Sequence, residues 1–483
     1  MSQWPRCPTL YEINTWVWLG ELRERFGDST HLGCVPEAEW DSLARFGFDA
    51  VWLMGVWERS PAGIAIANGN PGLLRDFRRA LPDFRPRDNV GSPYCVRRYV
   101  VDRQLGGPEG LAVARAELAK RGMRLILDFV PNHVAPDHPW VLEHPDYFIH
   151  GDVEDIARDP ASFVEAEGCV FARGRDPNFP AWQDVLQLNA FQPGLREEAR
   201  KTLSGIAAQC DGVRCDMAML LMNAVFERTW GNRAGPPPAT EYWTDAISSI
   251  RGTHPDFLFV AEAYWDLEWA LQQQGFDFCY DKRLYDRLRR EDAGSVRLHL
   301  QAPVSYQEKL VRFIENHDES RAAAAFSPER ERAAAVIIAT LPGARLFHDG
   351  QTEGRKIRLP VFLGRRPAEA ADQALEKFYE TLLKAIDNSP LRDGQWSLYE
   401  FASQPDPGDV LGWTWKHGER QCLVLVNFGG HPAQPCIEAP WSEYSEWHDL
   451  FSGESYRRSG TRTGNAPFRV ELEPWSYRIF EFS

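Results

Sequence analysis

Short apolar runs alternate with amphipathic stretches through most of the 483 residues. This alternation is typical of repeated β–α units that build a parallel sheet. Eight runs are predicted to be strands: Leu10–Trp18, Ala50–Met54, Arg124–Val130, Gly212–Asp216, Phe257–Glu262, Phe276–Tyr280, Val311–Ile314 and Ala344–Phe347. Eight such strands with helices between them predict an α/β fold, a (β/α)8 TIM barrel.

Two of the intervening stretches show clear helical periodicity. Pro193–Cys210 places Leu195, Ala199, Leu203 and Ile206 on one face and should lead into the fourth strand. A second helix, Pro367–Ile386, carries an apolar stripe and should close the barrel.

Two segments depart from this pattern. Residues 133–188 are rich in Asp, Pro, His and aromatic residues and lack helical periodicity, which predicts a small inserted lobe after the third strand. From about Trp396 onward, apolar residues alternate with a period of two between Gly, Pro and Asn turns. We therefore predict a barrel over 1–132 and 189–390, the lobe over 133–188, and a C-terminal antiparallel β-sandwich over 391–483.

Composition narrows the class of partner. Apolar residues make up 43% and charged residues 25%, as in an ordinary globular protein, and the net charge is −15. A nucleic-acid partner needs a basic face, and no run of Lys or Arg supplies one. The N-terminus lacks a signal peptide, no apolar stretch could span a bilayer, and the nine cysteines are dispersed. We expect a cytoplasmic protein with no membrane or nucleic-acid partner.

Polar residues at four strand ends are the candidates for chemistry, because barrel enzymes build their sites at the carboxyl ends of strands. The motifs are LILDFVPNH, GVRCDMA, FLFVAEAYW and VRFIENHDES. Each alone has a structural explanation, since Asp and Asn often cap helices and a His is often buried in the core. Four ionisable strand ends in one order are hard to explain by coincidence.

These four segments match, in sequence and order, the signature regions of the α-amylase family of glycoside hydrolases and transglycosylases, which the chain resembles over nearly its whole length. The resemblance implies a retaining, α-specific enzyme. Its catalytic residues would be Asp216 as nucleophile, Glu262 as general acid/base and Asp318 as their electrostatic partner.

The chemistry of retention agrees with these roles. It needs a carboxylate nucleophile and a protonated carboxyl group roughly 5 Å apart. Arg214 precedes Asp216 by two residues and so shares its strand face, where it can hold the nucleophile ionised. Apolar neighbours on both sides of Glu262 should raise its pKa. Cys215, beside Asp216, is expected to be a structural thiol.

The resemblance also implies a substrate-binding set around one sugar. His133 and His317 match histidines that bind hydroxyls, and Asp128 matches the residue that organises the site around the arginine. Tyr94, in GSPYCVRRY, matches a tyrosine that stacks on the sugar, although a core role is equally open. Arg321 is a further candidate beside Asp318.

Three departures limit the assignment of substrate. Asn132 occupies the position of a calcium ligand in many relatives, but no other oxygen ligands can be identified, so no cofactor is required and calcium stays open. Met217-Ala218-Met219 replaces the Lys-His of some starch-degrading relatives. Residues 59–93 include a probable Arg-rich helix, either a solvated surface helix or a lid over the acceptor side.

We expect an enzyme that acts on an α-glucan, a maltooligosaccharide or a small α-glucoside. An alternative is a glucosyl or maltosyl transferase with a disaccharide or sugar-phosphate donor, because the segment APDHPWVLEHPDYF is similar to maltosyltransferases that use maltose 1-phosphate. A non-catalytic carbohydrate-binding scaffold is a third reading, although all three carboxylates are present. The sequence does not indicate the oligomeric state.

Overall fold

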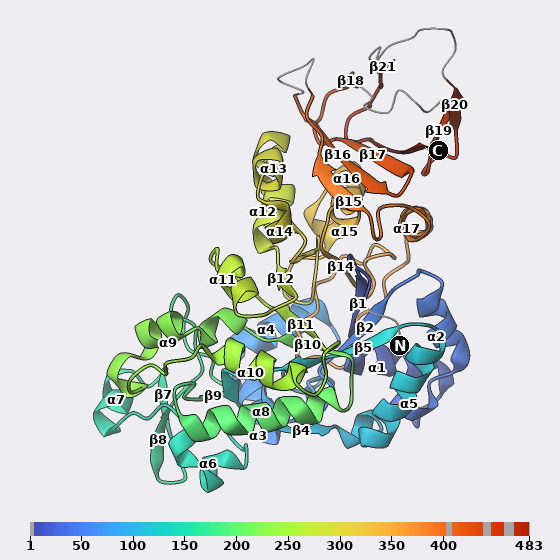
Figure 1. Cartoon of the computed structure of the whole chain (residues 1–483). Coiled ribbons are helices and arrows are strands. Elements are labelled where there is room, and N and C mark those ends of the chain that lie inside the picture. Colours follow the sequence, from blue (N-terminus) through green and yellow to red (C-terminus); the bar gives the residue numbers. More distant parts are fainter. Residues whose placement is uncertain (1–3, 402–407, 438–445, 458–467, 483) are drawn as a thin grey trace.

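The computed structural model describes residues 4–401, 408–437, 446–457 and 468–482, and a closed parallel barrel lies at its centre (Figure 1). The barrel strands follow the order β1-β14-β13-β12-β11-β10-β5-β2. They are β1 (Thr9–Asn14), β2 (Ala50–Met54), β5 (Arg124–Phe129), β10 (Gly212–Cys215), β11 (Leu258–Ala261), β12 (Phe278–Tyr280), β13 (Leu310–Arg312) and β14 (Ala344–His348). The predicted TIM barrel is confirmed.

The first predicted strand was too long, and its second half is helical. β1 ends at Asn14, and α1 (Thr15–Phe26) begins at the next residue. The Asn14 side chain accepts a hydrogen bond from the Val17 amide at 3.4 Å and so caps the helix. Trp16, Val17 and Trp18 are buried on α1, which explains why the apolar run continues past the end of the strand.

The two predicted helices both form. α8 (Pro193–Ala207) buries Leu195, Ala199, Leu203 and Ile206, the face expected from the sequence. α17 (Gln373–Asp387) begins six residues later than Pro367, because Asp372 caps it by accepting from the amides of Ala374 and Leu375, each at 3.0 Å.

Residues 133–188 form short, local elements beside the barrel. β6 (His133–Val134) pairs with β9 (Leu186–Gln187), and β7 (Phe163–Ala166) pairs with β8 (Cys169–Ala172). The helices α6 (Trp140–Glu143) and α7 (Val153–Arg158) are each less than two turns long. A buried cluster that includes Val134, Phe148, Phe171 and Leu186 gives this segment its own small core.

The stretch between β2 and Tyr94 contains two helices, α3 (Pro61–Gly69) and α4 (Pro71–Ala80). Arg75, Arg78 and Arg79 are exposed on α4, while Phe77 is buried beneath it. The Arg-rich segment is therefore helical, as predicted, and has an apolar underside.

Residues after α17 form an antiparallel domain, as predicted. Its main sheet has the order β15-β16-β17-β22-β19-β20, with β15 (Gln395–Leu398), β16 (Val410–His417), β17 (Arg420–Asn427), β22 (Tyr477–Phe482), β19 (Glu446–Asp449) and β20 (Ser455–Arg457). Within the described residues the opposing layer is only the pair β18 (Cys436–Ile437) and β21 (Phe468–Arg469). Figure 1 shows the main sheet above the barrel, beside α16 (Pro328–Thr340).

No helix among these described residues has the length and apolar character that a membrane span requires.

Candidate active site

The carboxyl ends of β10 and β11 bring two carboxylates together. Asp216 directly follows β10 and Glu262 directly follows β11, its parallel neighbour. Their backbones are fixed by ladder hydrogen bonds, from the Asp216 amide to the Phe129 carbonyl at 2.8 Å and from the Glu262 amide to the Cys215 carbonyl at 3.0 Å. Both side chains are buried, at 6% and 4% exposed. The barrel thus positions both groups on rigid strand ends.

One guanidinium joins these carboxylates. Arg214 Nη1 donates to Asp216 Oδ1 at 2.6 Å, and Nη2 lies 2.7 Å from Glu262 Oε2. The Arg214 side chain is 1% exposed, and the rings of Trp52, Tyr94 and Tyr280 surround it at 5.1 to 5.7 Å. A planar guanidinium can hold two acceptors in fixed geometry, which an ammonium cannot do.

Glu262 has a proton available near neutral pH. Burial raises its pKa to about 7, with the charge of Asp216 acting in the same direction and Arg214 opposing it. Its Oε2 accepts from the Met217 amide at 2.7 Å, and its Oε1 accepts from the Tyr264 hydroxyl at 2.8 Å. Met217 adopts φ +43°, a left-handed conformation at the point where the chain turns after β10.

The pKa of Asp216 depends on a different balance between burial and charge. Burial raises its pKa above the ordinary value, while the ion pair and hydrogen bond from Arg214 lower it. Burial thus raises the pKa of both carboxyl groups, while Arg214 acts on both to lower it. An acid and a nucleophile in one site need environments that set their protonation separately.

A third carboxylate lies at the mouth of the barrel beside a chain of buried polar groups. Asp318 Oδ2 lies 3.0 Å from His317 Nε2, which also contacts the Tyr94 hydroxyl at 2.7 Å. On its other side, His317 Nδ1 bonds to Glu12, which projects from β1 and is fully buried. The Asp318 side chain is 40% exposed, so the site opens to solvent here.

This group of buried polar residues favours the charged form of the His317 imidazole. Burial lowers the pKa of His317, but Asp318 and Glu12 outweigh it and raise that pKa well above the ordinary value. Burial acts to raise the pKa of Asp318, yet the His317 ion pair brings it below its usual range. Glu12 and Asp318 therefore hold an imidazolium between them.

Asp128 lies on β5 and His133 on β6, which follows it in the chain. Burial lowers the pKa of His133 to about 3, so its ring is neutral, and it lies 5.0 Å from the Trp182 ring. Asp128 pairs in register with Arg214 across β5 and β10, but its oxygens accept from Trp52 Nε1 at 3.1 Å and the Gly55 amide at 2.8 Å. Asp128 thus acts on Arg214 through charge and through the Trp52 ring rather than by direct contact.

Arg321 is held by polar groups beyond the three carboxylates. It is 5% exposed, and its guanidinium contacts Glu315 Oε1 at 3.1 Å, His348 Nδ1 at 2.8 Å and the Asp349 carbonyl at 2.9 Å. It lines a cavity together with His317, and its role in substrate binding stays a prediction.

The surroundings of Asn132 do not fit a calcium ion. Nε2 of the Gln187 side chain donates to three oxygens. They are Asn132 Oδ1 at 3.0 Å, the Asn132 carbonyl at 2.9 Å and the Leu188 carbonyl at 3.0 Å. A calcium site needs six to eight oxygens turned toward a cation, whereas these three accept from an N–H donor. No cluster of His, Cys, Asp or Glu suited to a metal occurs within the described residues.

Sequence reasoning missed Glu12 and Tyr264. Glu12 had a signal, since it is the one charged residue in the apolar run TLYEINTW and so had to be paired inside the barrel. The sequence carried no signal for Tyr264 or for the Met217 amide, because their contacts with Glu262 depend on the turn after each strand. Cys215 is fully buried, and burial raises its pKa well above the ordinary value, as expected of a structural thiol.

Comparison with known proteins agrees with this geometry. The model of the alpha amylase catalytic domain matches residues 39–404. The chain is 24% identical to alpha-amylase MalA of Haloarcula japonica, over 97% of this chain and 61% of that protein. It is 27% identical to an alpha-1,4-glucan:maltose-1-phosphate maltosyltransferase of Bifidobacterium longum, over 46% of this chain and 25% of that protein. The chain thus spans less than two thirds of the length of these relatives.

Solved structures share the fold over the whole chain. An alpha-amylase from Lactobacillus plantarum aligns with a TM-score of 0.70 at 17% identity, covering 99% of each chain. A maltogenic alpha-amylase, AmyB, from Thermotoga neapolitana aligns equally well at 18% identity. At these identities the likeness concerns the fold alone.

Proposed function

Because the chain belongs to the alpha-amylase family, we propose that it is a retaining α-glycoside hydrolase or transglycosylase that forms a covalent glycosyl–Asp216 intermediate. Its substrates would be α-glucans, maltooligosaccharides or small α-glucosides. The observation that carries this proposal is the position of Arg214, which donates to Asp216 from Nη1 and forms an ion pair with Glu262 through Nη2. Close pairing of two carboxyl groups, roughly 5 Å apart, distinguishes retaining from inverting glycosidases.

The reaction would proceed in two displacements. In the first, Glu262 donates its proton to the glycosidic oxygen as that bond to the anomeric carbon breaks, and Asp216 Oδ forms an ester bond to the same carbon. In the second, Glu262, now ionised, takes a proton from water or from a sugar hydroxyl. That oxygen attacks the anomeric carbon and releases Asp216. Water gives hydrolysis, and a sugar hydroxyl gives transfer.

The remaining polar groups would bind the sugar and stabilise positive charge on its ring. Asp318 stays ionised beside the opening, where it can accept from sugar hydroxyls and face the oxocarbenium-like transition state. The neutral His133 can donate to a hydroxyl. The Tyr94 ring is held in place by its bond to His317 and offers an apolar face for stacking.

A sugar phosphate is less well supported as the donor than a neutral glycoside. A cavity of about 420 Å³ lies beside Glu262, where the leaving group must be protonated, and its lining includes Met217 and Tyr264. Its two cations are already paired: Lys282 Nζ lies 2.7 Å from Asp286, and Arg283 lies 3.3 Å from Asp266. Asp176 and Glu268 add further negative charge to this lining. A phosphate here would meet more negative charge than positive.

We also propose that the protein needs no calcium and acts in the cytoplasm. The Gln187 side-chain amide, which donates to the three oxygens around Asn132, supports the first point. Six buried cysteine thiols support a reducing compartment: Cys7, Cys95, Cys210, Cys215, Cys279 and Cys422.

The test is turnover of a panel of maltose, sucrose, trehalose, maltooligosaccharides and maltose 1-phosphate, with product separation, by the wild-type protein and by Asp216→Asn. We expect turnover of neutral α-glucosides and a loss of several orders of magnitude in the variant, with folding and sugar binding retained. Sugar binding without turnover by the wild-type protein would favour a non-catalytic scaffold. An unchanged rate in Asp216→Asn would refute the nucleophile.

A further inference from the structure

Two cavities of very different size adjoin the proposed site on different arcs of the barrel mouth. The one beside Glu262, at the ends of β10 to β12, has about 420 Å³. The other lies past His317, at the ends of β13, β14 and β1, and has about 30 Å³. By the same measure the second cavity is less than a tenth as large as the first, so it is by far the more confined of the two.

The position of Glu262 tells which cavity faces which part of the substrate. The general acid protonates the leaving oxygen, so the leaving group and any acceptor lie beside Glu262 and Tyr264. The small cavity, beyond His317, is then on the glycone side, where a glucan chain would continue toward its non-reducing end.

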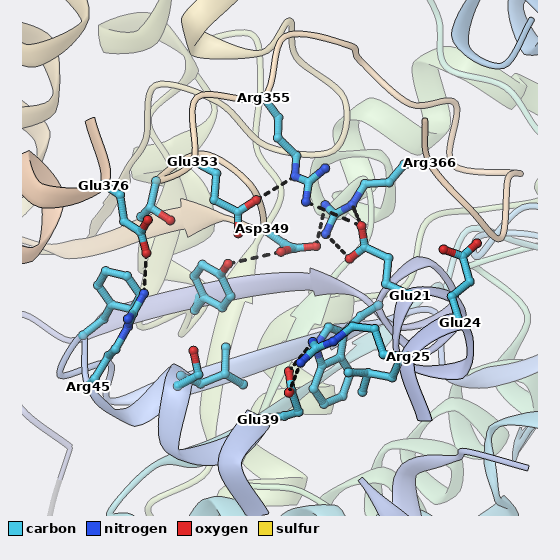
Figure 2. Close-up of a pocket in the computed structure, with 17 residues that line it drawn as sticks. Glu21, Glu24, Arg25, Glu39, Arg45, Asp349, Glu353, Arg355, Arg366 and Glu376 are labelled. Atoms are coloured by element: carbon cyan, nitrogen blue, oxygen red, sulfur yellow. Dashed lines mark hydrogen bonds and ion pairs between the residues drawn. The ribbon is translucent and has the colours of Figure 1, made fainter. Parts of the chain in front are cut away.

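A single stretch of chain closes the glycone side. We call residues 355–366 the wall segment; its residues Ile357, Arg358, Leu359 and Val361 line the small cavity. Figure 2 shows how both ends of the wall segment are anchored on α1 and the β14 loop. Arg355 donates to Glu353 at 2.8 Å, while Arg366 donates to Glu21 at 2.6 Å and pairs with Asp349 at 2.8 Å.

The middle of the wall segment is clamped by the stretch that follows α4. The Val90 amide donates to the Phe362 carbonyl at 2.8 Å, and the Gly364 amide donates to the Asp88 carbonyl at 2.9 Å. Arg365 adds a two-pronged ion pair with Asp88, at 2.9 and 2.8 Å. A forked arginine–carboxylate pair fixes orientation as well as proximity.

Apolar packing completes the closure on both faces of the wall segment. Leu363 is fully buried against Phe77 of α4 and Leu81. Val361 packs on the inner core of the barrel, as does Tyr94. The wall segment therefore sits directly over the strand ends, next to the ring that would stack on the sugar.

We propose that this wall limits the glycone side to a single glucosyl ring, so that the enzyme attacks the non-reducing end of its substrate and transfers or releases one glucose at a time. This inference rests on the proposed function and names its substrate class: terminal, unblocked α-glucosyl units. The helix α4 thus supports a wall on the glycone side, whereas the sequence left open a solvated surface helix or a lid over the acceptor side.

Arg358 is placed to contact the end of the chain. It lines the small cavity, and its charge helps to lower the pKa of Asp318. Unlike Arg355, Arg365 and Arg366, it forms no ion pair with a described carboxylate, so its N–H groups can donate to hydroxyls of the terminal glucose. Where an α-1,4 bond continues the chain, the 4-hydroxyl of that glucose is replaced by a glycosidic oxygen that cannot donate.

The test uses maltoheptaose labelled at its reducing end, with products separated at early times. We expect unlabelled glucose and labelled maltohexaose first, followed by stepwise shortening. Labelled maltose or maltotriose at the first time points would show internal cleavage and overturn the wall. Absence of turnover of maltoheptaose and of every disaccharide would instead refute the proposed function.

Two further arms make the result specific to the wall segment. Maltoheptaose whose terminal glucose carries a 4,6-O-ethylidene group should be inert to the wild-type protein, and cleavage at the wild-type rate would contradict the proposal. Arg365→Ala should loosen the clamp and give internal products, while Arg78→Ala, on the exposed face of α4, should keep the wild-type pattern. Stepwise release by Arg365→Ala as well would refute the role of the clamp.

Discussion

At the scale of single residues, the site depends on charges that are buried together and neutralise one another. Arg214 holds two carboxylates, and His317 holds two more, Glu12 and Asp318. Each cation is almost fully buried, so removing one partner leaves an uncompensated charge in a region of low dielectric. Effects on activity should therefore exceed those of ordinary surface pairs.

Glu12 is predicted to act through His317 as a positioning residue. Glu12→Gln removes the negative charge behind the imidazole, so the pKa of His317 should fall and Asp318 should lose its cation at moderately alkaline pH. A hydrogen bond to a charged group contributes about 1.5–3 kcal/mol. We expect kcat/KM to fall roughly 10- to 100-fold, with the pKa of His317, followed by NMR, moved to lower pH. An unchanged pKa of His317 would mean that Glu12 is only structural.

The pH dependence follows from two carboxyl groups. Activity requires Glu262 protonated, so it should fall as pH rises through about 7, the raised pKa of that group. It requires Asp216 ionised, and because burial raises the pKa of Asp216, the acid limb should lie above the ordinary range of an aspartate. A profile of kcat/KM that keeps rising above pH 8 would contradict the assignment of Glu262 as the acid.

At the scale of elements, most strands were readable from sequence because they are short, mainly apolar runs between longer helical stretches. The boundary at Asn14 was not readable, since α1 begins with Trp16, Val17 and Trp18, and periodicity cannot separate a buried strand from a buried helix over so few residues.

Most of the site was predicted, and its omissions have a common cause. Asp216 and Glu262 directly follow β10 and β11, where the barrel fixes their direction. Asp318 lies in the loop after β13, and its match to a known motif, rather than a strand end, identified it. The places of Tyr264 and Arg358 depend on loop paths, which no periodicity encodes. The wall segment needs contacts between residues some 275 positions apart, such as Asp88 and Arg365.

The junction between β6, β9 and the barrel yields a prediction about metals. The side-chain amide of Gln187 already donates to the three oxygens around Asn132, so these oxygens are not available to a calcium ion. A chelator should therefore leave Tm unchanged, and added calcium should not raise it. Gln187→Glu provides the matched control: a carboxylate among these oxygens should lower Tm, and calcium should restore it. A fall in Tm of the wild-type protein with chelator would contradict this account.

At the scale of the whole molecule, the barrel and the C-terminal sheet share one hydrophobic core. Trp415, on β16, is 1% exposed, and its indole nitrogen donates to the Thr340 carbonyl at the end of α16 at 2.8 Å. The same buried cluster includes residues of α16 and α17. The C-terminal sheet is therefore packed into the hydrophobic core of the barrel domain.

Trp415→Ala should destabilise the protein as a unit. Loss of a fully buried tryptophan costs about 3–5 kcal/mol, and denaturant unfolding should show one transition at lower denaturant concentration. Trp269→Ala, at a residue that is 51% exposed, is the control and should change stability little. Two separate transitions in the wild-type protein would show that the sheet and the barrel unfold independently.

The central claim is the covalent glycosyl–Asp216 intermediate, and trapping it is the most direct measurement. A fluorinated α-glucosyl fluoride, which forms the ester readily but slows its breakdown, is incubated with the protein, and the digest is examined by mass spectrometry. We predict one added glycosyl mass on the peptide that contains Asp216, absent in Asp216→Asn. Turnover of α-glucosides with no adduct, or an adduct on another carboxylate, would contradict the account.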